Sequence, residues 1–188
     1  MEALFTSTST VALAEMGDKT QLLALFLATR FASKINIVLG ILCATLLNHA
    51  VSTWLGIELA QWFPANIINW IVGFSFIAVG LWLLIPDKDE SADNQLLKYG
   101  AFCATFMLFF LAEIGDKTQV ATVLLGAHYG SMWAVLLGST VGMMMTNVPV
   151  IFAGRWLMDQ VNAKRTRQLA CLLFIIIGMI TLVTPYLQ

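Results

Sequence analysis

The segment Leu13-Ala14-Glu15-Met16-Gly17-Asp18-Lys19-Thr20-Gln21 returns 98 residues later as Leu111-Ala112-Glu113-Ile114-Gly115-Asp116-Lys117-Thr118-Gln119, with eight identities in nine positions. A match of this length indicates an internal duplication. The same shift, without gaps, pairs Gly40 with Gly138, Gly56 with Gly154 and Gly80 with Gly178. We therefore expect a first repeat over residues 1–85, an acidic cytoplasmic linker over residues 86–97 and a second repeat over residues 98–188.

The composition predicts an integral membrane protein. Of the 188 residues, 59% are hydrophobic and 11% charged, with a mean hydropathy of +0.83, whereas about a quarter of an ordinary soluble domain is charged. A helix needs about 20 apolar residues to cross a bilayer. Windows of that length predict six spans, over Leu4–Thr29, Ile35–Ile57, Ile67–Ile85, Tyr99–Leu125, Met132–Ala153 and Gln168–Leu187. The expected fold class is thus an all-α integral membrane protein with six transmembrane helices.

The repeat and the charges predict a topology. Three helices per repeat is an odd number, so the second repeat enters the bilayer from the opposite side, as in many secondary transporters. Eight basic residues lie outside the motifs, all of them in loops one, three and five: Arg30, Lys34, Lys88, Lys98, Arg155, Lys164, Arg165 and Arg167. By the positive-inside rule, these loops are cytoplasmic and both termini are extracytoplasmic.

Other residues exclude some function classes. A net charge of −1 leaves no basic surface for nucleic acid. Cys43, Cys103 and Cys171 lie apart in apolar stretches and are interpreted as small packing residues, not as a disulfide framework or a zinc site. We expect no prosthetic group.

The two motifs place four acids at membrane depth. Glu15 and Asp18 are three residues apart, as are Glu113 and Asp116, so on a helix each pair projects from one face. Ionisable groups there cost about 2.5–3.5 kcal/mol each and usually face a cavity with a function. In a simpler alternative, each glutamate only neutralises the lysine four residues later.

Four carboxylates and two lysines leave two negative charges, which one divalent cation or two protons would neutralise. A site that binds either one divalent cation or two protons, but not both, fits a cation/proton exchanger. Oxygen ligands favour Mn²⁺, Ca²⁺ or Mg²⁺ over zinc and copper. The auxiliary ligand candidates are Thr20, Gln21, Asn48, Thr118, Gln119 and Asn147.

Three further features are weighed beside these ligands. His128 is expected in a solvated loop, and His49 is either a ligand or a partner in a hydrogen bond between helices. Met143-Met144-Met145 is interpreted as a set of packing residues, with a thioether that faces the site and favours Mn²⁺ over Ca²⁺ as the alternative. Gly17 and Gly115, between the acids of each pair, are positions for a break in the helix.

The duplicated Glu-x-Gly-Asp-Lys-Thr, once in each half, resembles the signature of the calcium:cation antiporter-2 family, and within it the bacterial manganese exporters of the MneA type. The resemblance spans the whole chain and implies proton-coupled export of Mn²⁺, or movement of Ca²⁺, across the inner membrane of a bacterium. Carried onto this sequence, the cation- and proton-binding acids are Glu15, Asp18, Glu113 and Asp116.

Three other functions are kept as alternatives to an antiporter. A passive divalent-cation channel also uses acids for selectivity but moves no protons in return. The second alternative function is export of small organic cations. An intramembrane aspartyl protease would use Asp18 and Asp116 as a dyad, but this leaves the glutamates unexplained, so we expect no enzyme. A monomer is sufficient for transport, and the sequence leaves open whether the protein forms a homo-oligomer.

Overall fold

The computed structural model describes residues 1–86, 94–154, 156 and 162–184, and over these residues it is all helical. The helices are α1 (Glu2–Glu15), α2 (Lys19–Arg30), α3 (Lys34–Gln61), α4 (Ala65–Trp82), the 3₁₀ helix η1 (Asn94–Tyr99), α5 (Gly100–Glu113), α6 (Lys117–Tyr129), α7 (Met132–Ala153) and α9 (Ala163–Val183). Most of the predicted linker, Arg155 and the end of the sixth predicted span lie outside the described residues.

Four segments in the described part are long and apolar enough to cross a membrane: Lys34–Gln61, Gln95–Glu113, Met132–Ala153 and Ala163–Val183. A shorter apolar helix covers Ile67–Trp82. The windows predicted over Ile35–Ile57 and Met132–Ala153 are each one continuous helix in the structure.

The first and fourth predicted spans are not continuous helices. The first breaks between α1 and α2, and the fourth breaks between α5 and α6. At the breaks, Gly17 has φ +83° and Gly115 has φ +76°, a left-handed conformation that side chains with a Cβ disfavour. The glycine between the two acids therefore allows each chain to leave the helix, as the sequence predicted.

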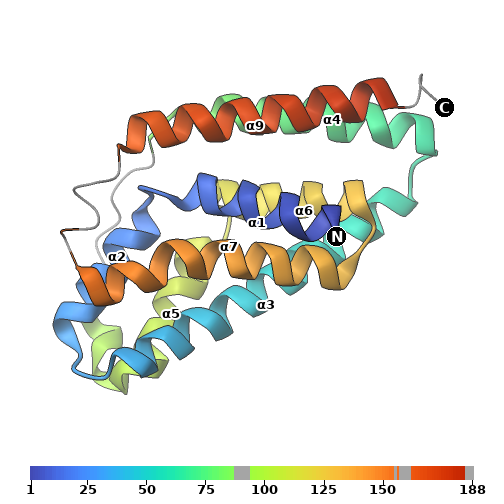
Figure 1. Cartoon of the computed structure of the whole chain (residues 1–188). Helices are drawn as coiled ribbons and strands as arrows, with labels where there is room; N and C mark the ends of the chain where they lie inside the picture. The colour runs from blue at the N-terminus through green and yellow to red at the C-terminus, as the bar shows by residue number, and fades with distance from the viewer. Residues whose placement is uncertain (87–93, 155, 157–161, 185–188) are drawn as a thin grey trace.

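The helices of the two halves interlock (Figure 1). The broken helix α1–α2 of the first half packs on α7 of the second, and α5–α6 of the second half packs on α3 of the first. Helix α4 pairs with α9. Each break is therefore held against a long helix from the other half.

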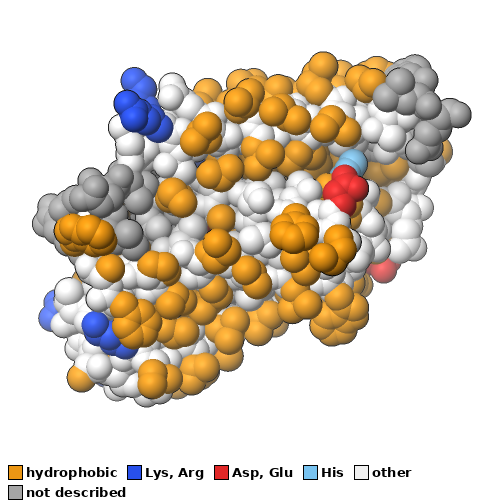
Figure 2. Space-filling model, in the orientation of Figure 1, with side chains coloured by type: hydrophobic (Ala, Val, Ile, Leu, Met, Phe, Trp, Pro, Cys, Tyr) orange, Lys and Arg blue, Asp and Glu red, His pale blue; other side chains and the backbone are white. Residues whose placement is uncertain are grey.

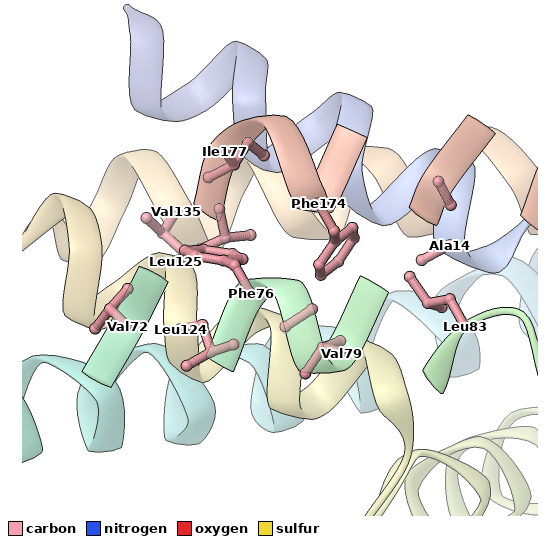
Figure 3. Packing of buried hydrophobic residues seen from close by; sticks show 12 residues of the cluster. Ala14, Val72, Phe76, Val79, Leu83, Leu124, Leu125, Val135, Phe174 and Ile177 are labelled. Carbon is pink, nitrogen blue, oxygen red and sulfur yellow. The ribbon is translucent and has the colours of Figure 1, made fainter. Parts of the chain in front are cut away.

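A hydrophobic cluster holds the α4–α9 pair to the rest of the molecule (Figure 3). Phe76 of α4 and Phe174 of α9 are fully buried, with ring centroids 5.9 Å apart. Leu125 of α6 and Val135 of α7 are in the same cluster. This packing places the end of α4 beside the break after α1, where Leu83 and Ala14 belong to the cluster as well.

Hydrophobic and basic side chains occupy different parts of the surface along the long axis of the molecule. On the face in Figure 2, hydrophobic side chains cover the middle, and Lys and Arg gather at the end where α3 and α9 begin. The N-terminus and the end of α9 lie toward the opposite end (Figure 1). Cys43 and Cys103 are on the surface, so their assignment as packing residues was wrong because their helices turn them outward, whereas Cys171 is buried.

Candidate cation site

Three carboxylates from the two motifs meet in the interior. Glu15, Glu113 and Asp116 are 0%, 1% and 6% exposed, and a carboxylate oxygen from each lies within 4.8 Å of the others. Glu15 ends α1, Glu113 ends α5, and Asp116 is the N-cap of α6, where its side chain accepts from the Thr118 N–H at 3.1 Å. The two helix breaks therefore bring acids 98 and 101 residues apart into one cluster.

Glu15 is held by the threonines of both motifs. The Thr20 hydroxyl donates to Glu15 Oε2 at 2.6 Å, and the Thr118 hydroxyl donates to Glu15 Oε1. The second bond joins the two halves of the chain. Sequence reasoning named both threonines as auxiliary residues but missed that they converge on one carboxylate, because no spacing encodes a contact across 103 residues.

Glu113, at the equivalent position, has different surroundings. Neither of its carboxylate oxygens has a hydrogen-bond partner among the described residues, although the side chain is buried. A buried carboxylate without donors is costly unless a proton or a cation neutralises it. Glu113 is thus the position where the site most needs a bound positive charge.

The two motif lysines have contacts outside their own motifs. Lys19 Nζ lies 3.2 Å from Asp116 Oδ1 in the other motif. Lys117 donates to the carbonyl of Ile85 and lies over the ring of Trp82. The break moves each lysine to the start of a new helix, away from the last turn that carries its own glutamate, so the i,i+4 spacing of an unbroken helix no longer applies.

Asp18, the fourth predicted acid, lies beside the three-carboxylate cluster and not within it. Its side chain is half-buried and lines a pocket that reaches Asp116. Arg167 at the start of α9 also lines this pocket. Sequence reasoning gave Arg167 only a topological role, and nothing in the sequence connects it with the motifs.

The two glutamines stabilise the breaks. Gln21 Oε1 accepts from the Gly17 N–H at 2.9 Å, and Gln119 Oε1 accepts from the Gly115 N–H at 2.7 Å. Gln21 Nε2 also donates to the Thr146 carbonyl of α7 at 2.9 Å. These bonds satisfy backbone groups that the breaks would leave open. A ligand role for the glutamines stays a prediction.

The polar residues of α3 and α7 lie in corresponding places. Asn48 Nδ2 donates to the Phe110 carbonyl at 3.2 Å, and Asn147 Nδ2 donates to the Met143 carbonyl at 3.1 Å. Asn147 Oδ1 and both ring nitrogens of His49 are buried without a hydrogen-bond partner among the described residues. Because His49 and Asn147 are repeat equivalents, α3 and α7 each carry an unsatisfied polar group at the same position of the repeat.

Two further predictions concern residues outside the cluster. The solvated loop expected for His128 was wrong: it lies in α6, its Nδ1 is 3.3 Å from Thr181 Oγ1, and its ring contacts Phe76. The His128 side chain is half-buried between α4 and α9, which supply these two contacts. Of the three methionines expected to be packing residues, Met143 is fully buried, whereas Met145 is 60% exposed, so the prediction was wrong for Met145.

The three clustered carboxylates and Lys19 together leave a formal charge of −2 in a site without other described basic partners for Glu15 or Glu113. Such a site suits a divalent cation with oxygen ligands. A family model described as "Divalent cation/proton antiporter GDT1" matches residues 3–91 and again residues 101–188. The chain belongs to the GDT1 family. The expected resemblance to a family of cation/proton antiporters is confirmed, whereas the assignment to the calcium:cation antiporter-2 family stays a prediction. GDT1 is a family of cation transporters and not an enzyme class.

Individual relatives agree with this assignment. A Vibrio cholerae serotype O1 protein named "Putative manganese exporter" is 43% identical over 182 residues, which are 96% of this chain and 90% of the relative. "GDT1-like protein sll0615" of Synechocystis is 25% identical over 91% of this chain and 92% of its own length. "GDT1-like protein 5" of Arabidopsis thaliana is 26% identical over 92% of each chain. No solved structure matches the chain.

Proposed function

We propose that this protein is a secondary antiporter that exports Mn²⁺ in exchange for protons, with Ca²⁺ as the second candidate cation. The observation that carries the proposal is the buried cluster of Glu15, Glu113 and Asp116, in which Glu113 has no hydrogen-bond donor among the described residues. We infer that these three acids, with Asp18 from the adjoining pocket, bind the cation and the protons in turn.

The charge of the site supports exchange over binding alone. Three carboxylates and one lysine amount to −2, the charge that one divalent cation or two protons would cancel. In a low-dielectric interior, a state with neither is expensive. The empty carrier is therefore disfavoured unless protons occupy it, and cation release on one side is tied to proton uptake there.

The choice of cation rests on ligand chemistry and on similarity. Carboxylate and hydroxyl oxygens suit Mn²⁺ and Ca²⁺, and neither Cys nor His is in the cluster. The similarity to the Vibrio cholerae protein named as a manganese exporter favours Mn²⁺.

For the architecture we propose two inverted three-helix repeats, over residues 1–85 and 98–188, that rock about the site. The two broken helices would each count as one span, giving six in all. The interlocked packing of each half on the other supports this arrangement. The gathering of Lys and Arg at the end away from the N-terminus and the end of α9 supports an extracytoplasmic location of both termini in the bacterial inner membrane.

The test is uptake of Mn²⁺ and Ca²⁺ into proteoliposomes that contain a pH dye. We expect metal entry with matched proton exit in the wild type, and neither in the Glu15→Gln/Glu113→Gln double variant. The matched control is Glu58→Gln, which removes a half-buried carboxylate of α3 that is not in the cluster and should leave transport unchanged.

Each other outcome contradicts part of the proposal. Metal entry without proton movement would indicate a passive channel. Full exchange in the double variant would exclude the carboxylate site. Folded wild-type protein that moves neither metal would direct the search to small organic cations.

A further inference from the structure

Arg167 places a guanidinium in the wall of the pocket beside the candidate cation site. Its side chain is half-buried and lies near the start of α9. It lines the pocket together with Asp18 and Asp116, and with Leu83 at the end of α4. Helix α9 begins at the end of the molecule where Lys and Arg gather (Figure 1, Figure 2). The pocket therefore lies between the carboxylates and this basic end.

The positive charge of Arg167 is not repeated in the other half of the chain. The shift of 98 residues pairs the aspartates of the two motifs with each other, and likewise the lysines. The same shift pairs Arg167 with Asn69, near the start of α4. Helix α4 begins at the opposite end of the molecule from α9 (Figure 1). Among the described residues that line the pocket, Arg167 is thus the charged residue whose repeat equivalent is neutral.

A guanidinium in this pocket opposes the binding of a divalent cation in two ways. It repels a cation that enters the pocket, and it attracts the carboxylates that the cation would bind. Arginine keeps its charge across the physiological pH range. Salt screens charges in a partly buried pocket less than charges on an open surface. Both effects therefore weaken cation binding from the end of the molecule where α9 begins.

We propose that Arg167 sets a low affinity for the cation on the cytoplasmic side, whereas Asn69 leaves the extracytoplasmic side without this repulsion. The inference rests on the proposed antiport function, in which the halves exchange conformations and Asn69 takes the place of Arg167 in a pocket on the other side. Arg167 acts on the cation through its charge and is not a ligand.

The asymmetry determines when the exporter works. With a low affinity on the cytoplasmic side, the site loads only when the cytoplasmic concentration of the cation is high. The direction of exchange is unaffected, because the two gradients and the stoichiometry set it. Arg167 therefore gives the exporter a concentration threshold for its substrate.

The test measures the KM for Mn²⁺ from each side of the membrane. Everted vesicles expose the cytoplasmic face, right-side-out vesicles expose the extracytoplasmic face, and vesicles without the protein give the background. Initial rates of Mn²⁺ uptake are recorded over a range of concentrations, with a pH dye inside to follow proton exit. The KM and kcat are compared between the wild type, Arg167→Gln and Arg167→Lys.

Loss of the charge should change affinity and not turnover. Arg167→Gln should lower the KM in everted vesicles by about three- to tenfold, the effect of one elementary charge on a divalent cation in a partly buried pocket. Its kcat, and its KM in right-side-out vesicles, should be unchanged. Arg167→Lys keeps the charge and should keep the wild-type KM. A side chain that only supports α9 would instead affect kcat or folding, with no gain in affinity.

Two further variants control for position. Arg165→Gln removes the same charge two residues earlier in α9, from an exposed side chain that does not line the pocket, and should leave the KM unchanged. Asn69→Arg is the converse change. It should raise the KM in right-side-out vesicles and leave the KM in everted vesicles unchanged.

Three results would overturn the proposal: an unchanged or higher KM for Arg167→Gln in everted vesicles, an equal fall for Arg165→Gln, or a fall confined to right-side-out vesicles. If Arg167→Gln does not fold, Asn69→Arg decides, and an unchanged KM in right-side-out vesicles would then overturn the proposal.

The proton signal separates this inference from the proposed function. If the wild type exchanges Mn²⁺ for protons but the KM does not respond to Arg167, the inference fails and the proposed function stands. If Mn²⁺ enters without proton exit, the proposed function fails, and the change in KM still tests Arg167. If the folded wild type moves no Mn²⁺, both fail.

Discussion

The unequal surroundings of Glu15 and Glu113 predict that the same substitution at the two positions has different effects on stability. Glu15 accepts from two hydroxyls and Glu113 from none among the described residues, although both are buried. Conversion to Gln removes one buried carboxyl group in each case. In Glu15→Gln it also replaces two charge-assisted hydrogen bonds by neutral ones.

The size of the difference follows from these two bonds. A hydrogen bond to a charged group contributes about 1.5–3 kcal/mol and a neutral one about 0.5–1.5 kcal/mol, so two bonds lose about 2–3 kcal/mol when the acceptor becomes neutral. We therefore expect Glu113→Gln to be more stable than Glu15→Gln by this amount. For a chain of this length, about 2–4 °C per kcal/mol gives a difference in Tm of about 4–12 °C.

The assay is thermal unfolding of the purified protein in detergent with a chelator present, followed by tryptophan fluorescence. Glu58→Gln is the control and should unfold within about 0.5 kcal/mol of the wild type, because it lies outside the cluster. Equal Tm values for the two variants, or a higher value for Glu15→Gln, would refute the assignment of both threonine hydroxyls to Glu15.

Two further predictions concern the break and the cation. Gly115→Ala should lower the free energy of unfolding by about 1–2 kcal/mol in the same assay. The φ angle there is +76° and an added Cβ would meet no atom within 4 Å, so backbone strain is the whole cost. An unchanged Tm would contradict this. Mn²⁺ at about 100 times its Kd should stabilise the wild type by about 2.7 kcal/mol and leave Asp116→Asn unchanged, and equal stabilisation of both would remove Asp116 from the site.

Much of the molecule was predictable because local rules decide it. Apolar windows of bilayer length gave the extents of α3 and α7, and the glycine between two acids marked both breaks. The shift of 98 residues correctly indicated that the two motifs have equivalent local structures. These features depend on a residue and its near neighbours along the chain.

Other predictions failed where packing between halves decides the outcome. The sequence left the role of Lys19 open and did not predict its ion pair with Asp116 of the other motif. His128 was expected in a solvated loop, yet it lies half-buried in α6 in contact with Phe76 and Thr181. Cys43 and Cys103 are exposed. The sequence could not predict this, because an apolar helix in a membrane protein has no polar face to show which side is buried.

The sequence by itself determined that the chain is helical, duplicated and rich enough in apolar residues for a membrane, and that each half carries two acids beside a glycine. Only the tertiary structure decided that Glu15, Glu113 and Asp116 form one cluster, that both threonines bind Glu15, and that the two lysines differ. The reason is physical: identical segments obey the same local rules, but within one folded chain their neighbours come from opposite halves and need not be alike.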